Sequence, residues 1–228
     1  MNTPHFTTGL GRATPTVARR SAASVMLALA LAQLPSAALA QANAQASTVI
    51  SAAVHTPAVT AVEGISFERE IALAGSTLKL NGAGIRSKFV FKVYAAGLYL
   101  PATAKTSTDV YVSKGPKRLK VVFLRDTDSS SLGKTMSEVM SDNLPREQFG
   151  KCIPGLIKLG EVFANKRKMV TGEGFTMDEV PGEGTVVNIN GQQVAKIAEP
   201  EFFTCLMYNY FGDKPADPKL KMALLGGQ

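Results

Sequence analysis

Histidine and cysteine, the side chains most often used for nucleophilic, acid–base and metal chemistry, are scarce in this chain. His5 lies in a leader-like segment and His55 in a low-complexity stretch, and the two cysteines are Cys152 and Cys205. A folded region without histidine excludes Ser-His-Asp and Cys-His catalysis, His-ligated haem and nearly all zinc sites. Two cysteines also cannot complete a four-ligand metal site. We therefore expect no cofactor, and chemistry restricted to carboxylates, hydroxyls, amides, Lys and Arg, or binding alone.

Two glycine motifs resemble nucleotide-binding loops but lack essential residues. Gly133-Lys134-Thr135 matches the end of a phosphate-binding loop, but Asp128 stands where the first glycine of that loop belongs. Gly82-Ala83-Gly84 lacks the third glycine of a dinucleotide fingerprint, so we interpret it as a bulge or a turn. The cationic runs at 114–120 and 166–168 lack interleaved aromatic residues, which favours a solvated surface over a nucleic-acid site.

The first 40 residues have the pattern of a secretory signal peptide. The pattern comprises arginines without any acid, an apolar run too short to span a bilayer, a proline and a small-residue ending: Arg12, Arg19, Arg20, Val25 to Leu34, Pro35 and Ala38-Leu39-Ala40. Cleavage after Ala40 removes three of the positive charges that make up the net charge of +7. We expect a periplasmic or secreted protein without a stable membrane span. Residues 41–63 have almost no charge or periodicity and predict a flexible spacer, so we place the folded domain at 64–228.

Alternating apolar residues predict an antiparallel sheet in two blocks of sequence. Two half-buried strands are expected between Ile65 and Leu80, with a turn at Gly75-Ser76. A long strand is expected from Lys88 to Leu100, with Phe89, Phe91 and Val93 on one face, and another from Arg118 to Leu124. Later strands are predicted at 169–175, 184–189 and 192–197, the last two joined by a hairpin at Asn190-Gly191.

Between and after these blocks the apolar spacing becomes helical. The first predicted helix has an apolar stripe of Leu132, Met136, Val139 and Met140, and the second has Phe149, Ile153, Leu156, Ile157 and Gly160. Pro200 is expected to open a third helix, and Asp217-Pro218 a short last one that ends at Gly226-Gly227. Strands and helices in this order predict an α+β domain with helices on one face of the sheet.

The two cysteines could pair in an oxidising compartment. Cys152 is predicted at the flank of the apolar stripe of its helix, and Cys205 off the stripe of its own, so neither is required for the core. Nothing in the sequence indicates that the two helices meet. Both a disulfide and two free thiols therefore remain open.

Two separated segments resemble one known family. Gly82 to Lys88 runs directly into Phe89 to Leu100, and Tyr208 to Pro215 is followed by Ala223 to Gly226. These segments resemble the chalcone isomerase-like family, in particular its bacterial members with a signal peptide, over about Gly64 to Gly226. The resemblance implies an open-faced β-sandwich, in which a large antiparallel sheet carries helices on one face and a ligand cleft lies between them.

The resemblance also implies which residues line the cleft. The plant enzymes use an Arg after the Gly-rich segment, a Thr in the long strand, a Tyr and an Asn on a helix, and a hydroxyl residue on the penultimate helix. Arg86 matches the Arg and Asn143 the Asn. Tyr94 replaces the Thr, Met136 the Tyr, and Asn209 the hydroxyl residue. Because hydroxyl groups that could polarise a ketone are lost, we expect no chalcone isomerase activity and assign no catalytic residue.

The same residues suggest a binding site. Met136 and Asn143 are seven positions apart and share one helix face, so both could line a mostly apolar cleft. A guanidinium from Arg86 and a phenol from Tyr94 in such a cleft suit a carboxylate on an apolar body. The plant fatty-acid-binding members of the family also use an Arg and a Tyr for the carboxylate, as the resemblance implies. The alternative is that Arg86 pairs with a structural acid and Tyr94 only packs.

Three functions fit the sequence. The preferred one is a periplasmic, non-enzymatic, lipid-binding protein whose partner is a small apolar acidic ligand such as a fatty acid. A structural or interaction domain with a vestigial cleft and an intramolecular lyase, or isomerase, are the alternatives. The sequence specifies neither a protein partner nor an oligomeric state.

Overall fold

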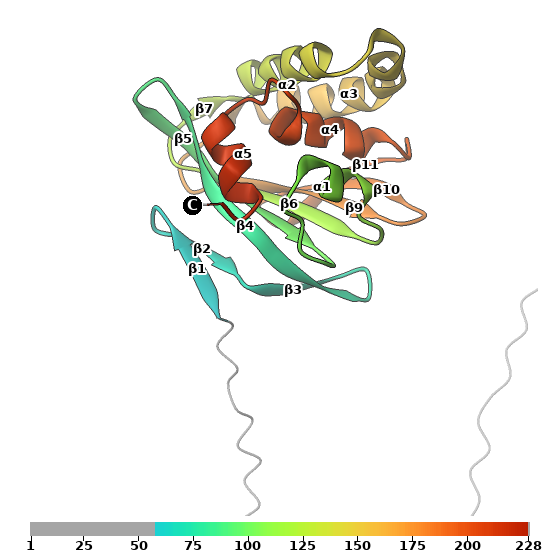
Figure 1. Cartoon of the computed structure of the whole chain (residues 1–228). Helices are drawn as coiled ribbons and strands as arrows, with labels where there is room; N and C mark the ends of the chain where they lie inside the picture. Colours follow the sequence, from blue (N-terminus) through green and yellow to red (C-terminus); the bar gives the residue numbers. More distant parts are fainter. Residues whose placement is uncertain (1–57, 228) are drawn as a thin grey trace, which may run out of the picture. The chain divides into compact units, whose positions relative to one another are not determined.

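The computed structural model describes residues 58–227 (Figure 1), so the predicted signal peptide lies outside the described residues. The predicted spacer does so only as far as residue 57. Strand β1 (Val59–Val62) already pairs with β2 (Ile65–Glu68), and Val62 packs against a cluster around Phe67. The domain therefore starts before Gly64, because β1 is paired with the strand that follows it and Val62 is partly buried against the Phe67 cluster.

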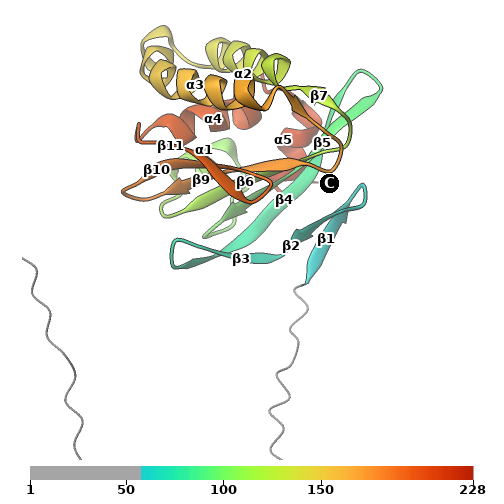
Figure 2. The ribbon, with the colours of Figure 1, turned by 180° about the vertical axis from the view of Figure 1, so that it is seen from behind.

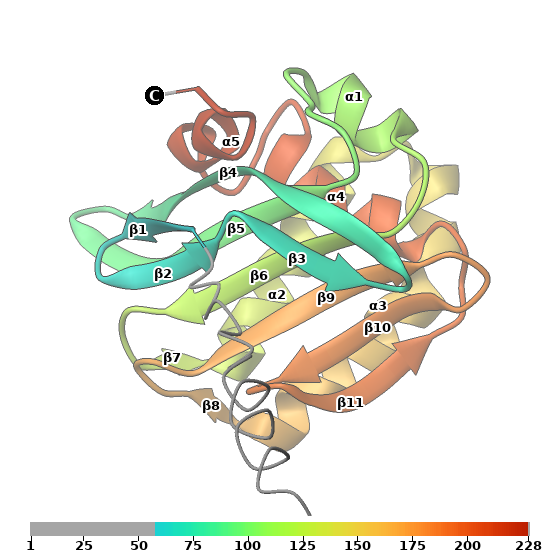
Figure 3. The same cartoon turned by 90° about the horizontal axis from the view of Figure 1, so that it is seen from below.

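The centre of the fold is a seven-stranded antiparallel sheet with the order β11-β10-β9-β6-β5-β4-β3 (Figure 3). Its strands are β3 (Glu70–Leu73), β4 (Ser76–Lys88), β5 (Phe91–Leu100), β6 (Lys117–Phe123), β9 (Gly174–Val180), β10 (Gly184–Ile189) and β11 (Gln192–Ile197). Burial alternates strictly along β6, as expected for a strand whose two faces differ in cover. The hairpin predicted at Asn190-Gly191 joins β10 and β11, with both turn residues at positive φ.

The predicted long strand from Lys88 to Leu100 is wrong at its start. Lys88 pairs with Phe91, so Phe89 and Val90 form a two-residue turn between β4 and β5. Of Phe89, Phe91 and Val93, only Val93 is buried. The turn contains no Gly, Asn or Asp, and so it has none of the residues by which such turns are recognised in a sequence.

The helices cover one face of the sheet (Figures 1 and 2), which confirms the α+β class and the open-faced arrangement. They are α1 (Ser107–Val112), α2 (Ser129–Asn143), α3 (Arg146–Lys166), α4 (Phe202–Phe211) and α5 (Pro218–Leu224). The short helix α1 and strand β7 (Thr127–Asp128) were not predicted. The strand predicted at 169–175 is interrupted by a turn, which separates β8 (Lys168–Met169), the partner of β7, from β9. Within residues 58–227, no helix is long and apolar enough to cross a membrane.

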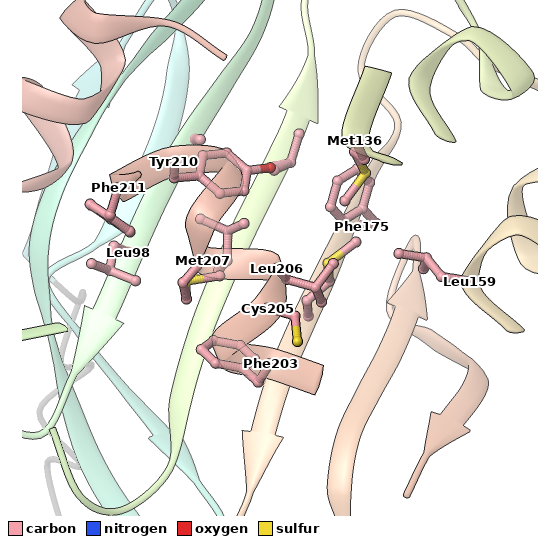
Figure 4. Close-up of a cluster of buried hydrophobic side chains, with 14 of the residues drawn as sticks. Leu98, Met136, Leu159, Phe175, Phe203, Cys205, Leu206, Met207, Tyr210 and Phe211 are labelled. Atoms are coloured by element: carbon pink, nitrogen blue, oxygen red, sulfur yellow. The ribbon is translucent and has the colours of Figure 1, made fainter. Parts of the chain in front are cut away.

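Helix α4 is buried on nearly all sides between the sheet and the other helices (Figure 4). Gly155 of α3 lets the two helices approach closely, because a Cβ at this position would lie 2.3 Å from the ring of Phe202. Cys152, one turn earlier on α3, forms a disulfide with Cys205 of α4, with their Cα atoms 6.2 Å apart. Both cysteines lie in the core rather than beside it, contrary to the expectation from the helix stripes.

The predicted stripe of α3 is shifted from the buried one. Leu159 and Phe163 are buried together with Cys152 and Gly155, whereas Ile153 and Ile157 are exposed. The shift follows from the contact with α4, which selects the face that carries the small residue Gly155.

Helix α5 lies on two glycines of β4. A Cβ at Gly82 would lie 2.1 Å from the carbonyl oxygen of Ala223, and one at Gly84 would lie 2.5 Å from the Cβ of Ala223. The register between β4 and β5 also shifts between Leu80 and Gly82, as a bulge does. The Gly82-Ala83-Gly84 motif therefore combines the predicted bulge with a close helix contact that no larger residue would permit.

Candidate functional site

Arg86 and Tyr94 are brought together by the pairing of β4 and β5. The two residues are directly opposite each other in the antiparallel register, so their side chains point to the same face. That face is the one covered by the helices, and Tyr94 is only 3% exposed there. The Cζ atom of Arg86 lies 5.7 Å from the centroid of the Tyr94 ring, which is within the range of a cation–π contact.

A second phenol, that of Tyr210 on α4, completes this group. Tyr210 and Tyr94 are hydrogen-bonded through their side chains, and both are buried. Burial raises the pKa of Tyr94, and it raises the pKa of Tyr210 well above its ordinary value. Both phenols therefore stay neutral at physiological pH and can donate hydrogen bonds. Tyr210 is one of the buried residues of α4, and nothing in the sequence indicates that it lies near Arg86.

Arg86 does not pair with a structural acid. Within residues 58–227, no carboxylate oxygen lies within 4.0 Å of its guanidinium nitrogens. Its Nε atom is buried and has no hydrogen-bond partner in this part of the chain. Buried polar atoms are nearly always hydrogen-bonded, and an unpaired donor on a cation is costly. The arrangement leaves Arg86 available to an anionic ligand.

Arg86 lines a cavity of about 270 Å³ at the end of the sheet where β4 turns into β5. The cavity lies between this hairpin, the segment after β6 and the first turns of α2. Its lining is Arg86, Lys88, Phe89, Phe91, Val93, Arg125, Asp126, Thr127, Asp128, Ser131, Leu132 and Thr135. This mixture of cationic, acidic, hydroxyl and apolar groups differs from the mostly apolar cleft that the sequence predicted. The volume is just below the range of about 300 to 1,000 Å³ typical of small-molecule sites.

The two acidic residues of the lining are already engaged by neighbouring groups. Asp126 forms an ion pair with Lys168, at 2.7 Å, and accepts a hydrogen bond from the backbone N–H of Thr171. Asp128 accepts a hydrogen bond from the hydroxyl of Ser130, at 2.6 Å, and caps α2 by accepting one from the backbone N–H of Ser131, at 2.8 Å. These contacts lower the pKa of both carboxyl groups, so both stay charged but partnered. The cations Arg86 and Lys88 keep their charge free for a ligand.

The other predicted site residues on α2 do not reach this cavity. Met136 is buried in the core and lines a separate apolar groove of about 430 Å³ between α2 and α3. The amide of Asn143 is used by the fold: it donates to the carbonyl oxygens of Val139 and Lys214 and accepts from the N–H of Lys214. Asn143 thus ties the end of α2 to the segment between α4 and α5.

The predicted residue on α4, Asn209, is likewise absent from the cavity lining. It is buried, and its amide nitrogen donates to the carbonyl oxygen of Leu206 at 3.2 Å. Its Oδ1 atom has no partner among the described residues. Of the five predicted residues, only Arg86 lines the cavity, together with Lys88 and the hydroxyl groups of Ser131 and Thr135. Tyr94 and Tyr210 lie beside Arg86 but are not part of the lining.

Comparisons with known proteins agree with this architecture. The chain matches the family model described as chalcone isomerase-like over residues 59–226. A fatty-acid binding protein of Arabidopsis thaliana has a similar crystal structure, with a TM-score of 0.54 and 16% sequence identity. That match covers 71% of this chain and 92% of the plant chain. No curated protein matches the sequence. Since the family model spans nearly all of the described residues, the chain belongs to the chalcone isomerase-like family.

Proposed function

We propose that the protein is a non-enzymatic binding protein for a small apolar carboxylate of the fatty-acid type. The observation that carries this proposal is Arg86, a cation at a cavity wall that has a buried, unpartnered Nε and forms no ion pair within residues 58–227. A guanidinium presents donors in a planar fork that matches a carboxylate. Tyr94 contacts this guanidinium from the adjacent strand, as expected for a head-group site.

The apolar part of the ligand has partners in the same cavity. Val93 and Leu132 form an apolar wall inside the cavity. Phe89 and Phe91 extend this wall to the surface at the hairpin between β4 and β5. A tail that extends from Arg86 toward Phe89 would bury apolar area along this path. The plant protein with the similar fold is a fatty-acid binding protein, which supports the same ligand class here.

We further propose that the protein works in the periplasm or is secreted. The signal-like sequence of residues 1–40 supports this location. The disulfide between Cys152 and Cys205 also fits an oxidising compartment. N-terminal sequencing of protein from the periplasmic fraction tests the proposal, and a sequence that still begins at Met1 would contradict it.

The binding experiment compares a long-chain fatty acid with the matching fatty alcohol by calorimetry. Arg86→Ala should weaken binding of the acid by about 1.5 to 3 kcal/mol, the range for hydrogen bonds to charged groups. Arg86→Lys should restore only part of the loss, since an ammonium lacks the planar fork. The alcohol should bind less tightly to the unmodified protein and change little on mutation.

Arg146→Ala is a matched control, because Arg146 is exposed at the start of α3. Its affinity for the acid should equal that of the unmodified protein. Equal losses for acid and alcohol in Arg86→Ala would mean that Arg86 supports the fold rather than the head group. Absence of binding by the unmodified protein would reject the proposed function.

A further inference from the structure

The hairpin tip, defined here as Lys88 to Lys92 at the turn between β4 and β5, exposes three consecutive apolar side chains. Phe89 is 90% exposed, Val90 87% and Phe91 55%. The tip projects beyond the sheet at the upper left of Figure 1. Single exposed apolar residues are ordinary on protein surfaces, but a contiguous apolar run at a protruding end marks an interaction site.

The backbone of the hairpin tip also departs from what folding alone favours. Phe89 has a φ of 55° at the first position of a two-residue turn. Glycine is preferred there because a Cβ strains the left-handed conformation. A bulky residue at such a position lowers the stability of the fold. Because Phe89 is almost completely exposed, burial of its side chain does not offset this cost. The folded state therefore gives no reason for Phe89, which suggests a role outside the domain.

Cations without acidic partners flank these apolar side chains. Within residues 58–227, Lys88 and Arg125 form no ion pair with a carboxylate. The guanidinium of Arg125 lies over the ring of Phe91, 4.5 Å from its centroid, next to the apolar run. Lys92 pairs with Glu63, but both groups remain about half exposed. A hairpin tip with apolar side chains flanked by cations is complementary to a surface whose outer groups are anionic and whose interior is apolar.

We propose that the hairpin tip inserts into the surface of an anionic lipid bilayer. Phe89 and Val90 enter the boundary between headgroups and acyl chains, while Lys88 and Arg125 bind the anionic headgroups. Phe89 and Phe91 also line the cavity of Arg86, so this contact places the cavity mouth against the membrane. The membrane contact goes beyond the proposed ligand binding and does not require it.

The absence of tryptophan from the chain makes the contact directly measurable. Phe89→Trp, in protein purified after expression of the full-length sequence, carries a single tryptophan at the hairpin tip. Its emission should shift to shorter wavelength with vesicles of phosphatidylcholine and phosphatidylglycerol, and much less with phosphatidylcholine alone. Val112→Trp is the matched control, because Val112 is 66% exposed on α1, which follows the opposite end of β5. Its emission should not change.

Vesicle co-sedimentation of two charge-insertion variants gives the second measurement. Phe89→Asp with Val90→Asp should lower the partition coefficient about tenfold or more, since burial of each apolar side chain changes it by that order. Asp tolerates the positive φ at position 89, so the fold should persist, as an unchanged or higher urea midpoint would show. Val112→Asp should bind vesicles as the unmodified protein does.

Three results would overturn the proposal. They are an unshifted Phe89→Trp spectrum with anionic vesicles, equal binding to neutral and anionic vesicles, and equal loss of binding in the tip and Val112 variants. If the Phe89→Trp spectrum is unshifted and the protein also fails to co-sediment with vesicles, the hairpin tip would be a contact for a protein instead of a membrane. No fatty acid is added in these assays, so their failure is distinct from failure of ligand binding.

Discussion

The disulfide between Cys152 and Cys205 joins α3 to the buried helix α4, and its removal should cost a large part of the stability of the domain. The two residues are 53 positions apart, so the bond closes a long loop in the unfolded chain. In the chain-entropy description, a loop of this size is worth about 4 kcal/mol at 25 °C, and measured effects usually fall at about 2 to 4 kcal/mol. We expect the double substitution Cys152→Ala with Cys205→Ala to lower the free energy of unfolding by this amount.

The assay is urea unfolding of the double variant and the unmodified protein, each with and without dithiothreitol. The unmodified protein should fall to the level of the variant when reduced, while the variant itself should not respond to the reductant. In thermal unfolding, the loss should appear as roughly 5 to 15 °C for a domain of this size. Equal urea midpoints for the oxidised and reduced unmodified protein, or two free thiols titrated after unfolding without reductant, would refute this reasoning.

Two further perturbations test other contacts of the fold. Gly84→Ala should lower the free energy of unfolding by about 1 to 3 kcal/mol, because the new Cβ would lie 2.5 Å from that of Ala223. Gly133→Ala, which has open space around it inside α2, should instead raise it by up to about 1 kcal/mol; equal effects of the two changes would contradict the packing argument. Glu173 has a pKa lowered by Lys166, so its stabilising effect is complete above the unfolded pKa of 4.5 and is lost as the pH falls through the folded value. In unfolding titrations below pH 5, Glu173→Gln should therefore flatten the acid-side decline in stability, and an unchanged slope would exclude this contribution.

The sequence predicts those parts of the fold that are determined by local patterns. Alternation reveals β6, the dipeptide Asn190-Gly191 reveals the hairpin between β10 and β11, and Asp217-Pro218 reveals the start of α5. The pairing of Arg86 with Tyr94 is local too, but it was not predicted, because Arg86 lies between the strands expected to end at Leu80 and to begin at Lys88. Each of these features depends on residues close together in the chain.

Features without a recognisable local pattern, or with partners far away in the chain, could not be predicted in this way. The turn at Phe89-Val90 interrupts a continuous apolar run without any turn-forming residue, so it looked like an uninterrupted strand. Asn143 forms hydrogen bonds with the backbone of Lys214, which is 71 positions away. In the sequence, an Asn that supports the fold in this way looks the same as an Asn that binds a ligand. Tyr210 looked like core because it is core on one side and faces Arg86 on the other.

Strand β4 holds both the contacts of α5 and Arg86, the proposed head-group residue, but at different positions. Gly82 and Gly84 allow α5 to lie directly on β4, and the helix cap Asp217 accepts a hydrogen bond from the backbone N–H of Ser87 at 2.8 Å. The contact of α5 with the strand ends there, so Arg86 lies at the cavity wall rather than under α5. A substitution at Gly84 should therefore change stability and leave the affinity of the folded protein for a carboxylate intact. Arg86→Ala should do the opposite, since its guanidinium makes no ion pair that the described fold requires.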